Sequence, residues 1–393
     1  MNFKLLEQYL DSLGEEYGLP GLDILVTKDH ETVYRHMTGF ADANGKRPVS
    51  DRDFYYFYSC SKVITMTAML QLIEEGKVSL YDPVCRFLPE WEYMTVINDD
   101  WKTRGLFFSP GIAEPAHFAK HQVRIIDLMS MTAGLTYDLE SEAIRKVKAK
   151  DPNANTREVI AALAEIPLLF EPGTHYQYSL AHDVIAAVIE VISGETFEDY
   201  LQNHLFKPLG ITDLTCRPTA EQLSRLSAMY DCLPDTKKIV LRENPVNIYA
   251  LTPNYESGGA GLGGTVNGYS PILEALANGG VGRTGARILK EETVKLFSRS
   301  VITGEALQEF RVWRFLEYSY GLGVRVKTDP TLGLSPVGEF GWDGAAGAYA
   351  MVDPVNHVSI FFAIHVHNFM DSYMVVHPRV RDLVYKGLAK KGL

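Results

Sequence analysis

The chain is poor in cysteine and lacks any long apolar run. Its 393 residues include four cysteines, Cys60, Cys85, Cys216 and Cys232. Their spacing does not match that of metal-ligand motifs, and we expect reduced thiols in a cytoplasmic chain. No apolar run is long enough to span a bilayer, and charged residues interrupt the N-terminal stretch where a signal peptide would be apolar. The sequence therefore predicts a cytoplasmic protein without a membrane segment.

Basic charge is also scarce. Lysine and arginine together number 38 against 49 aspartates and glutamates, the formal net charge is −11, and no stretch is rich in Lys and Arg. This balance argues against nucleic acid and anionic membrane surfaces as partners, and it suits small neutral or cationic ligands. The content of 46% hydrophobic and 22% charged residues is that of a globular protein large enough for two lobes. The expected partner is a small-molecule substrate, and the oligomeric state stays open.

Several motifs for cofactors and for one common hydrolase fold are missing. No G-x-S-x-G sequence occurs, which argues against the α/β-hydrolase fold. Residues 259–264 match G-x-G-x-x-G, but no buried-strand pattern precedes them, so a glycine-rich loop is favoured over a dinucleotide site. His365 and His367 share one strand face without a third ligand in sight, which favours a structural role over a metal site. We therefore expect neither a metal nor an organic cofactor.

Strand patterns lie at both ends of the chain. Residues 3–17 have helical spacing, and 22–27 and 31–36 read as the two strands of a hairpin. The apolar face of this first helix consists of Leu5, Leu6, Tyr9, Leu10 and Leu13. Further strands are predicted at residues 320–326, 348–352 and 358–366, followed by a last helix at about 378–389.

The middle of the chain has a helical period. Helices are predicted at residues 123–131, 156–164, 180–192 and 197–204. Strands at both ends with helices between them predict an α/β (α+β) fold of two lobes. We assign residues 1–83 and 226–393 to an α/β lobe with a central sheet, and residues 84–225 to a mostly α-helical lobe.

A long irregular stretch at residues 91–121 interrupts the helical part. Its aromatic residues are Trp91, Tyr93, Trp101, Phe107, Phe108 and Phe118. Loops of this length without clear structure are often lids or binding loops, and the alternative is an ordinary surface insertion.

The most informative stretch is a helix pattern that begins at Ser59. From Ser59 to Glu75 apolar residues lie on nearly every side, and Gly76 takes the usual C-cap place, so the helix is predicted to be buried. Lys62 follows one turn later on the same face, where its amine can take the serine's proton. Burial lowers the pKa of such an amine, while the helix N-terminus favours negative charge at the serine. These are the requirements for an activated serine nucleophile.

A simpler interpretation makes Ser59 an N-cap and Lys62 an amphipathic residue whose charged head reaches water. A Ser-x-x-Lys pattern occurs about once by chance in a chain of this length, so other motifs must decide. Tyr178 lies where a turn opens a long helix, and beside a lysine its phenol could be held partly as phenolate and move protons. The small residues of 341–347 precede a strand and favour either an oxyanion site or a tight hairpin.

Together these stretches resemble the motifs of the serine β-lactamase and penicillin-binding protein superfamily, in its class C β-lactamase and family VIII carboxylesterase branch. The likeness covers nearly the whole chain, through residues 57–62, 74–84, 128–135, 206–211 and 257–262. It implies a β-lactamase/transpeptidase-like fold, with an antiparallel sheet flanked by helices. It also implies that Ser59 is the nucleophile, Lys62 its base partner and Tyr178 the motif tyrosine. The N–H groups of Ser59 and Ala345 fall on the family's oxyanion hole.

Two departures from the lactamases of this superfamily concern the substrate. Leu180 replaces the asparagine of Tyr-x-Asn, whose amide helps to hold an acylamide side chain. Trp342-Asp343-Gly344 replaces Lys-Thr-Gly, which removes a cation and adds an anion where a β-lactam or peptide carboxylate would bind. We therefore expect Leu180, Trp342, Asp343 and Gly344 to contact the substrate, and both changes resemble the esterase branch.

The sequence thus predicts a serine hydrolase that forms an acyl-enzyme on Ser59, and a carboxylesterase for small or medium acyl esters in particular. A β-lactamase, a D-amino-acid peptidase or amidase, or an acyltransferase would use the same residues. A catalytically silent scaffold or binding module is the alternative from another class. The joint presence of Ser59, Lys62 and Tyr178 argues against that alternative.

Overall fold

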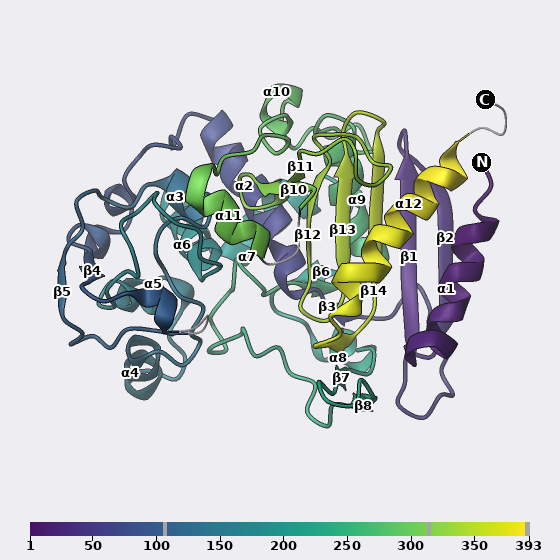
Figure 1. Ribbon diagram of the computed structural model, residues 1–393, viewed down its shortest axis with the longest axis horizontal. Helices are drawn as coiled ribbons and strands as arrows, with labels where there is room; N and C mark the ends of the chain where they lie inside the picture. The colour runs from purple at the N-terminus through teal and green to yellow at the C-terminus, as the bar shows by residue number, and fades with distance from the viewer. Residues whose placement is uncertain (105–107, 313–315, 390–393) are drawn as a thin grey trace.

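Seven antiparallel strands form the central sheet, in the order β10-β11-β12-β13-β14-β1-β2 (Figure 1). The computed structural model describes residues 1–104, 108–312 and 316–389. The strands are β1 (Gly21–Lys28), β2 (Glu31–Gly39), β10 (Tyr318–Tyr320), β11 (Arg325–Lys327), β12 (Phe340–Asp343), β13 (Tyr349–Asp353) and β14 (Val358–Ala363). Because β1 pairs with β14, segments from both ends of the chain meet within this sheet, and only β2 lies beyond β1. The predicted α/β fold with an antiparallel sheet is confirmed.

Most predicted strands are confirmed, and one is divided. The hairpin β1–β2 and the strands β13 and β14 lie where the sequence places them. The run 320–326 is wrong as a single strand, because β10 ends at Tyr320 and β11 begins only at Arg325. Gly323 lies in the turn between them with φ of 77°, a conformation that glycine adopts without steric cost. The strand predicted at 358–366 ends early, at Ala363.

Three smaller sheets complete the strand structure of the described residues. The first has the order β15-β7-β8, the second β3-β9-β6, and the third consists of β4 and β5. Their bounds are β3 (Tyr55–Tyr56), β4 (Thr95–Ile97), β5 (Ala116–Phe118), β6 (Leu214–Thr215), β7 (Tyr230–Cys232), β8 (Ile239–Leu241), β9 (Gly263–Gly264) and β15 (Val366–His367). The second of these sheets leads the chain into the candidate site.

Helices cover both faces of the central sheet. α1 (Lys4–Tyr17) and α12 (His377–Leu388) lie side by side on one face, and α9 (Val266–Ala277) packs against β1, β13 and β14 (Figure 1). Neighbouring residues of β14 point to opposite faces, as a pleated strand requires. Phe361 stacks on Tyr269 of α9, whereas Phe362 contacts His377 of α12. Each face therefore has its own apolar layer.

The first helix is confirmed with one correction. Leu6, Tyr9, Leu10 and Leu13 are buried against the sheet, whereas Leu5 is 61% exposed. Leu5 precedes Leu6 by about 100° around the helix axis and so falls outside the apolar stripe. The inclusion of Leu5 in the buried face was wrong.

The predicted helices of the middle region are also present. They gather beside the sheet, at the left of Figure 1, and the largest buried apolar cluster runs from them into α2 and the sheet. Their bounds are α3 (Ile125–Met129), α5 (Thr156–Leu163), α6 (Ala181–Ser193) and α7 (Phe197–Leu201). A further helix of this region, α4 (Glu142–Lys150), is not among the predicted ones. The remaining helices are α2 (Ser61–Glu74), α8 (Ala220–Ser224), α10 (Glu291–Val294) and α11 (Gly304–Val312). The boundaries of the two predicted lobes stay a prediction. In the described part of the chain, no helix has both the length and the apolar character needed to cross a membrane.

The described residues of the irregular stretch 91–121 include the two-stranded sheet β4–β5 and a 3₁₀ turn at Trp101–Thr103. Tyr93 and Phe118 are exposed, whereas Trp91 is buried in the core. Phe107 lies outside the described residues. A lid function for this stretch stays a prediction.

Candidate active site

A short strand and an unusual turn place Ser59 at the start of α2. After β3 the chain passes through Tyr58, whose φ of 46° is left-handed. Residues other than glycine rarely adopt this conformation, and such residues cluster at functional sites. A 3₁₀ turn at Tyr58–Cys60 then leads into α2, with Ser59 8% exposed. Ser59 is thus fixed at the entrance to a buried helix, and a small area of its side chain stays accessible to solvent.

Lys62 lies one helical turn from Ser59, as predicted. Its Nζ is 3.2 Å from Ser59 Oγ and donates to the carbonyl of Gly259 at 2.7 Å. The side chain is fully buried, and this burial lowers the pKa of Lys62 to about 7, against an opposing effect of the Asp183 carboxylate. The interpretation in which the lysine head reaches water is therefore wrong. Near neutral pH a large fraction of the molecules holds an uncharged amine beside the serine.

Tyr178 lies in the loop before α6 and completes the contacts of Ser59. Its Oη is 2.7 Å from Ser59 Oγ, and Lys62 Nζ lies 4.7 Å from the centre of its ring. Burial raises the pKa of Tyr178 above its usual value, and this effect exceeds the lowering by hydrogen bonds with Ser59 and Trp342. The expectation of a partial phenolate is thus wrong. The phenol keeps its proton, and Lys62 is the better base.

Trp342, in β12, lies against Tyr178. Its indole N–H donates to Tyr178 Oη at 3.2 Å, and the two rings are stacked with their centroids 5.7 Å apart. Tyr320 contacts the same indole edge-on, at 5.2 Å between centroids. A neutral donor and an aromatic surface therefore stand at the position where the resemblance places a lysine in the lactamases.

The turn between β12 and β13 passes beside Phe57, two residues before Ser59. A Cβ on Gly344 would lie 2.4 Å from the carbonyl oxygen of Phe57, so only glycine permits this approach. The turn is closed by hydrogen bonds from Gly344 N–H to the Ala348 carbonyl and from Gly347 N–H to the Gly344 carbonyl. Residues 341–347 are therefore both a tight hairpin and a close neighbour of the serine segment. Ala345 lies in this turn, and the oxyanion-hole role of its N–H stays a prediction.

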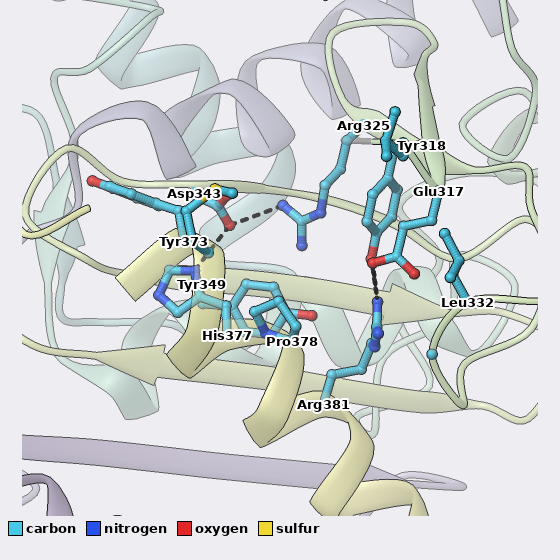
Figure 2. Close-up of a pocket in the computed structure, with 13 residues that line it drawn as sticks. Glu317, Tyr318, Arg325, Leu332, Asp343, Tyr349, Tyr373, His377, Pro378 and Arg381 are labelled. Atoms are coloured by element: carbon cyan, nitrogen blue, oxygen red, sulfur yellow. Dashed lines mark hydrogen bonds and ion pairs between the residues drawn. The ribbon is translucent and has the colours of Figure 1, made fainter. Parts of the chain in front are cut away.

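Asp343 points away from the serine, which corrects the expectation that it contacts the substrate. It follows Trp342 in a strand, and consecutive strand residues face opposite sides of the sheet. Its carboxylate lies 3.0 Å from Nη1 of Arg325 and 3.5 Å from Nδ1 of His377, on the side of α12 (Figure 2). Arg325 is 2% exposed and engaged with this carboxylate, so it does not offer its charge to a substrate at Ser59.

Leu180 lies at the N-terminal end of α6 and is 3% exposed. Its N–H donates to the carbonyl of Thr136 at 3.0 Å, and its side chain belongs to the main apolar core. The substrate contact expected of Leu180 stays a prediction.

Sequence reasoning missed two residues around Lys62. Tyr137 stacks on Tyr178 with centroids 5.2 Å apart and ring planes within 4° of parallel. Asp183, on α6, is completely buried and accepts a hydrogen bond from Tyr255 Oη at 2.8 Å. Burial raises the pKa of the Asp183 carboxyl. The sequence did contain a signal for Asp183. It is an acidic residue within the apolar pattern 180–192, and an Asp is almost never fully buried without a partner.

One cluster has the geometry of a metal site within the described ranges. His175, Glu305 and Glu309 each place a ligand atom within 4.8 Å of the others. Lys102 forms ion pairs with both glutamates, at 2.9 Å from Glu309. Its ammonium already compensates their charge, so the donor set does not fit a cation well. The cluster ties the 91–121 stretch to α11, and the expectation of no metal and no organic cofactor stays a prediction.

The chain is similar to known proteins in sequence and in fold. The family model Beta-lactamase matches residues 6–384. Esterase EstB from Burkholderia gladioli is 28% identical over 293 residues, which is 69% of each chain. Among solved structures, EstCE1, titled a hydrolase with promiscuous acyltransferase activity, covers 98% of both chains with a TM-score of 0.77 and 23% identity. Simvastatin synthase from Aspergillus terreus covers 99% of both chains with a TM-score of 0.77 and 18% identity. The predicted superfamily and its fold are confirmed.

Proposed function

We propose that this chain, which belongs to the Beta-lactamase family of serine hydrolases, is a carboxylesterase that forms an acyl-enzyme on Ser59. One observation carries the proposal. Ser59 Oγ lies 3.2 Å from an amine whose pKa is lowered to about 7 and 2.7 Å from a phenol. A base and an acid therefore contact the same hydroxyl, as acyl transfer through a serine requires.

The acylation step uses both groups. Neutral Lys62 accepts the proton of Ser59 while Oγ bonds to the ester carbonyl carbon, and the carbonyl π electrons move to its oxygen. The N–H groups of Ser59 and Ala345 are our candidates to hold that oxyanion. When the C–O bond to the alcohol breaks, the Tyr178 phenol gives its proton to the leaving alkoxide. The Lys62 ammonium then returns a proton to the tyrosine, so the acyl-enzyme forms with all protons accounted for.

Deacylation runs the same steps with water in place of serine. Lys62 takes a proton from the attacking water, and the oxyanion forms again at the acyl carbonyl. The bond to Ser59 Oγ then breaks, and the serine regains a proton from Lys62 or Tyr178. The products are the carboxylic acid and a regenerated enzyme.

Trp342, at the position where the resemblance places the third-motif lysine of the lactamases, supports esters over β-lactams. Trp342 donates a neutral N–H to Tyr178, and Arg325 is held by Asp343 on the other side of the sheet. A β-lactam or a peptide with a terminal carboxylate needs a cation to orient that group, whereas a simple ester does not. We infer a preference for uncharged esters with small or medium acyl groups.

Acyl transfer is a second candidate activity. An acyl-enzyme reacts with any nucleophile that reaches it, and EstCE1, similar in fold, is titled a hydrolase with promiscuous acyltransferase activity. If an alcohol competes with water at the acylated Ser59, ester exchange accompanies hydrolysis.

The test combines a label with a substrate panel. A fluorophosphonate should add once, at Ser59, and peptide mass mapping should find no label in Ser59→Ala. The panel compares p-nitrophenyl acetate and butyrate, nitrocefin, and a D-alanyl-D-alanine amide, with 1-propanol added as an acyl acceptor. We expect kcat/KM for the aryl esters to exceed that for nitrocefin by about a hundredfold or more, the scale of a lost charged contact.

Two results would overturn the proposal. Labelling that persists in Ser59→Ala, or that maps to Ser61 or Ser179, would show that the nucleophile is wrong. Turnover of nitrocefin or of the D-alanyl amide as fast as the best ester would replace the esterase by a lactamase or peptidase. Ester exchange with propanol would establish the second activity.

A further inference from the structure

The two N–H groups that are our candidates for the oxyanion hole belong to segments far apart in the chain. Ser59 follows β3 directly after Tyr58, whereas Ala345 lies in the turn between β12 and β13. An oxyanion hole works only when both donors lie about 2.7 to 3.1 Å from the same oxygen position. The two segments must therefore be fixed relative to each other.

Tyr58 decides the direction of one of these donors. Its φ of 46° lies in the left-handed region, which costs free energy for a residue other than glycine. The dihedral angles of Tyr58 set the plane of the peptide that carries the Ser59 N–H, so relaxation of this strain would turn the donor. Such a conformation persists only where the surrounding structure holds it.

The hydroxyl of Tyr58 is held by His367 of β15. Tyr58 is fully buried, its Oη lies 3.1 Å from His367 Nε2, and the two rings meet edge-on with centroids 4.9 Å apart. Burial raises the pKa of Tyr58, so the phenol keeps its proton. Within the described ranges, Nε2 is the one hydrogen-bond partner of this hydroxyl. Tyr58 therefore donates and His367 accepts.

His367 is itself fixed and uncharged. Burial, together with the nearby Arg242 guanidinium, lowers the pKa of His367 to about 4, so near neutral pH the imidazole has a free acceptor. The ladder of β15 with β7 places His367 opposite Asp231, whose carboxylate accepts from Arg242 Nε at 3.0 Å. The acceptor for Tyr58 thus stands on a strand that is anchored on its other side.

The same strand holds the second segment. Val366, the residue before His367, donates its N–H to the carbonyl of Ala346 at 3.0 Å. Ala346 follows Ala345 in the turn and belongs to the same small buried apolar cluster as Tyr58. The two residues of β15 therefore contact the neighbour of each oxyanion-hole donor, one through a side chain and the other through the backbone.

We propose that His367 is a positioning residue for acyl transfer, whose bond to Tyr58 directs the Ser59 N–H toward the oxygen that the Ala345 N–H also meets. The catalytic consequence rests on the proposed function, whereas the conformational one does not. An oxyanion exists only during the reaction, so a misdirected donor lowers kcat and leaves KM nearly unchanged.

Steady-state kinetics with p-nitrophenyl acetate tests the role. His367→Leu removes the acceptor, and we expect kcat to fall by about ten- to a hundredfold, less than the complete loss of one oxyanion donor costs. His367→Gln, whose amide oxygen can reach the position of Nε2, should restore most of the rate. Unchanged kcat in His367→Leu, or no rescue by His367→Gln, would overturn the proposal.

His365→Leu is the matched control. His365 is also buried, and among the described residues its ring contacts are with Tyr55 and Tyr56. Urea unfolding should show a loss of stability in both histidine variants, whereas kcat should fall only in His367→Leu. An equal fall of kcat in the two variants would make His367 a packing residue and no more.

A thionoester separates a turned donor from a general loss of structure. Sulfur accepts hydrogen bonds weakly and lies farther from carbon, so an oxyanion hole favours the oxygen ester. The ratio of kcat/KM for p-nitrophenyl acetate to that for its thiono analogue should fall in His367→Leu. The apparent pKa of about 7 that Lys62 gives to the pH profile should stay the same. A constant ratio would contradict the role in the oxyanion hole.

A double-mutant cycle tests the path through Tyr58. Tyr58→Phe removes the donor of the same bond, so the double variant with His367→Leu should be hardly slower than the slower single variant. If the two effects multiply instead, His367 does not act through Tyr58 and the proposal is wrong.

The conformational part has a test that needs no activity. A crystal structure of His367→Leu should show the Ser59 N–H turned from its direction in the wild type, and an unchanged backbone at residues 57–59 would overturn the proposal. Absence of ester turnover in the wild type would instead refute the proposed function, so the two proposals fail separately.

Discussion

Lys62 is fully buried, and we expect its protonation state to control the activity. Because burial lowers the pKa of Lys62 to about 7, the amine gains its role as base when it loses its proton near that pH. We predict that kcat/KM for p-nitrophenyl acetate rises with pH and reaches a plateau above an apparent pKa of about 7. Lys62→Arg, which keeps the charge and cannot deprotonate, should lose activity at every pH. A wild-type profile without this ascending limb would contradict the assignment of Lys62 as base.

The same residue links stability to pH. Its pKa is about 7 in the folded chain, against 10.5 for a lysine free of burial, so between these values the unfolded chain holds a proton that the folded chain lacks. The free energy of unfolding therefore rises as the pH rises from about 7 to 10.5. Below about pH 7 the cost of burying the ammonium destabilises the folded chain in full. We predict that Lys62→Met is more stable than wild type at pH 6 and that the difference shrinks toward pH 10. Urea unfolding followed by circular dichroism measures it, and a constant difference would contradict the shift.

Tyr178 contributes a proton where Lys62 removes one. Tyr178→Phe should lower kcat by on the order of 10² to 10⁴, the range for a lost general acid or base, with little change in stability. Tyr176→Phe is the matched control, since Tyr176 packs on Phe310 and Tyr320 at the same turn and should keep near wild-type rates. Because the pair acts as a unit, the double variant Lys62→Ala with Tyr178→Phe should be hardly slower than the worse single variant. Loss of activity in Tyr176→Phe alone would show that the wrong tyrosine was chosen.

At the scale of elements, the turn after β12 depends on one glycine. A Cβ at position 344 would overlap the Phe57 carbonyl, so Gly344→Ala should push the turn away from the serine segment and lower kcat much more than it changes KM. Gly111→Ala is the control, because the nearest atom to its added Cβ, Glu142 Oε2, lies at an ordinary 3.7 Å. Steady-state kinetics with a fluorophosphonate labelling rate checks the prediction. Normal kcat in Gly344→Ala would show that the turn plays no part in the chemistry.

The elements also show what the sequence could and could not predict. α1, the β1–β2 hairpin, α2 and α6 have strong periodicity, and local pattern was enough to find them. The break in 320–326 depends on one left-handed glycine within an apolar run, which periodicity does not register. α4 was missed because its sequence at 142–150 is dominated by charged residues with a narrow apolar stripe.

The candidate site divides in the same way. Ser59, Lys62 and Tyr178 stand in recognisable motifs, and the structure brings all three together. The direction of Asp343 was mistaken because a motif gives a position in the chain, whereas the face of the strand decides where the side chain points. Tyr137 joins the site because its loop packs on Tyr178 and beside Lys62, and no local pattern reports such contacts.

At the scale of the whole molecule, α1 and α12 together cover one face of the central sheet. Leu10 is completely buried there in the apolar cluster that also contains residues of β1, β14 and α12. Leu10→Ala should lower the free energy of unfolding by about 2 to 5 kcal/mol, because it creates a cavity in the apolar core. It should leave kcat unchanged, because this cavity lies far from Ser59. Leu5→Ala should be close to neutral, since Leu5 faces solvent. Urea titration of both variants tests this, and equal effects would contradict the orientation of α1.

The position of β1 between β2 and β14 has a consequence for how the protein is made. The register pairs Asp23 with Ala363 and Lys28 with Val358, so the inner edge of β1 acquires its partner only when nearly the whole chain has been translated. At ribosomal speeds that wait is on the order of tens of seconds. Throughout it the nascent hairpin presents a row of unpaired backbone groups, the kind of edge that recruits other chains. We therefore expect the expression yield to depend on chaperones that bind nascent chains. This dependence should be stronger than the stability of the folded protein alone would suggest.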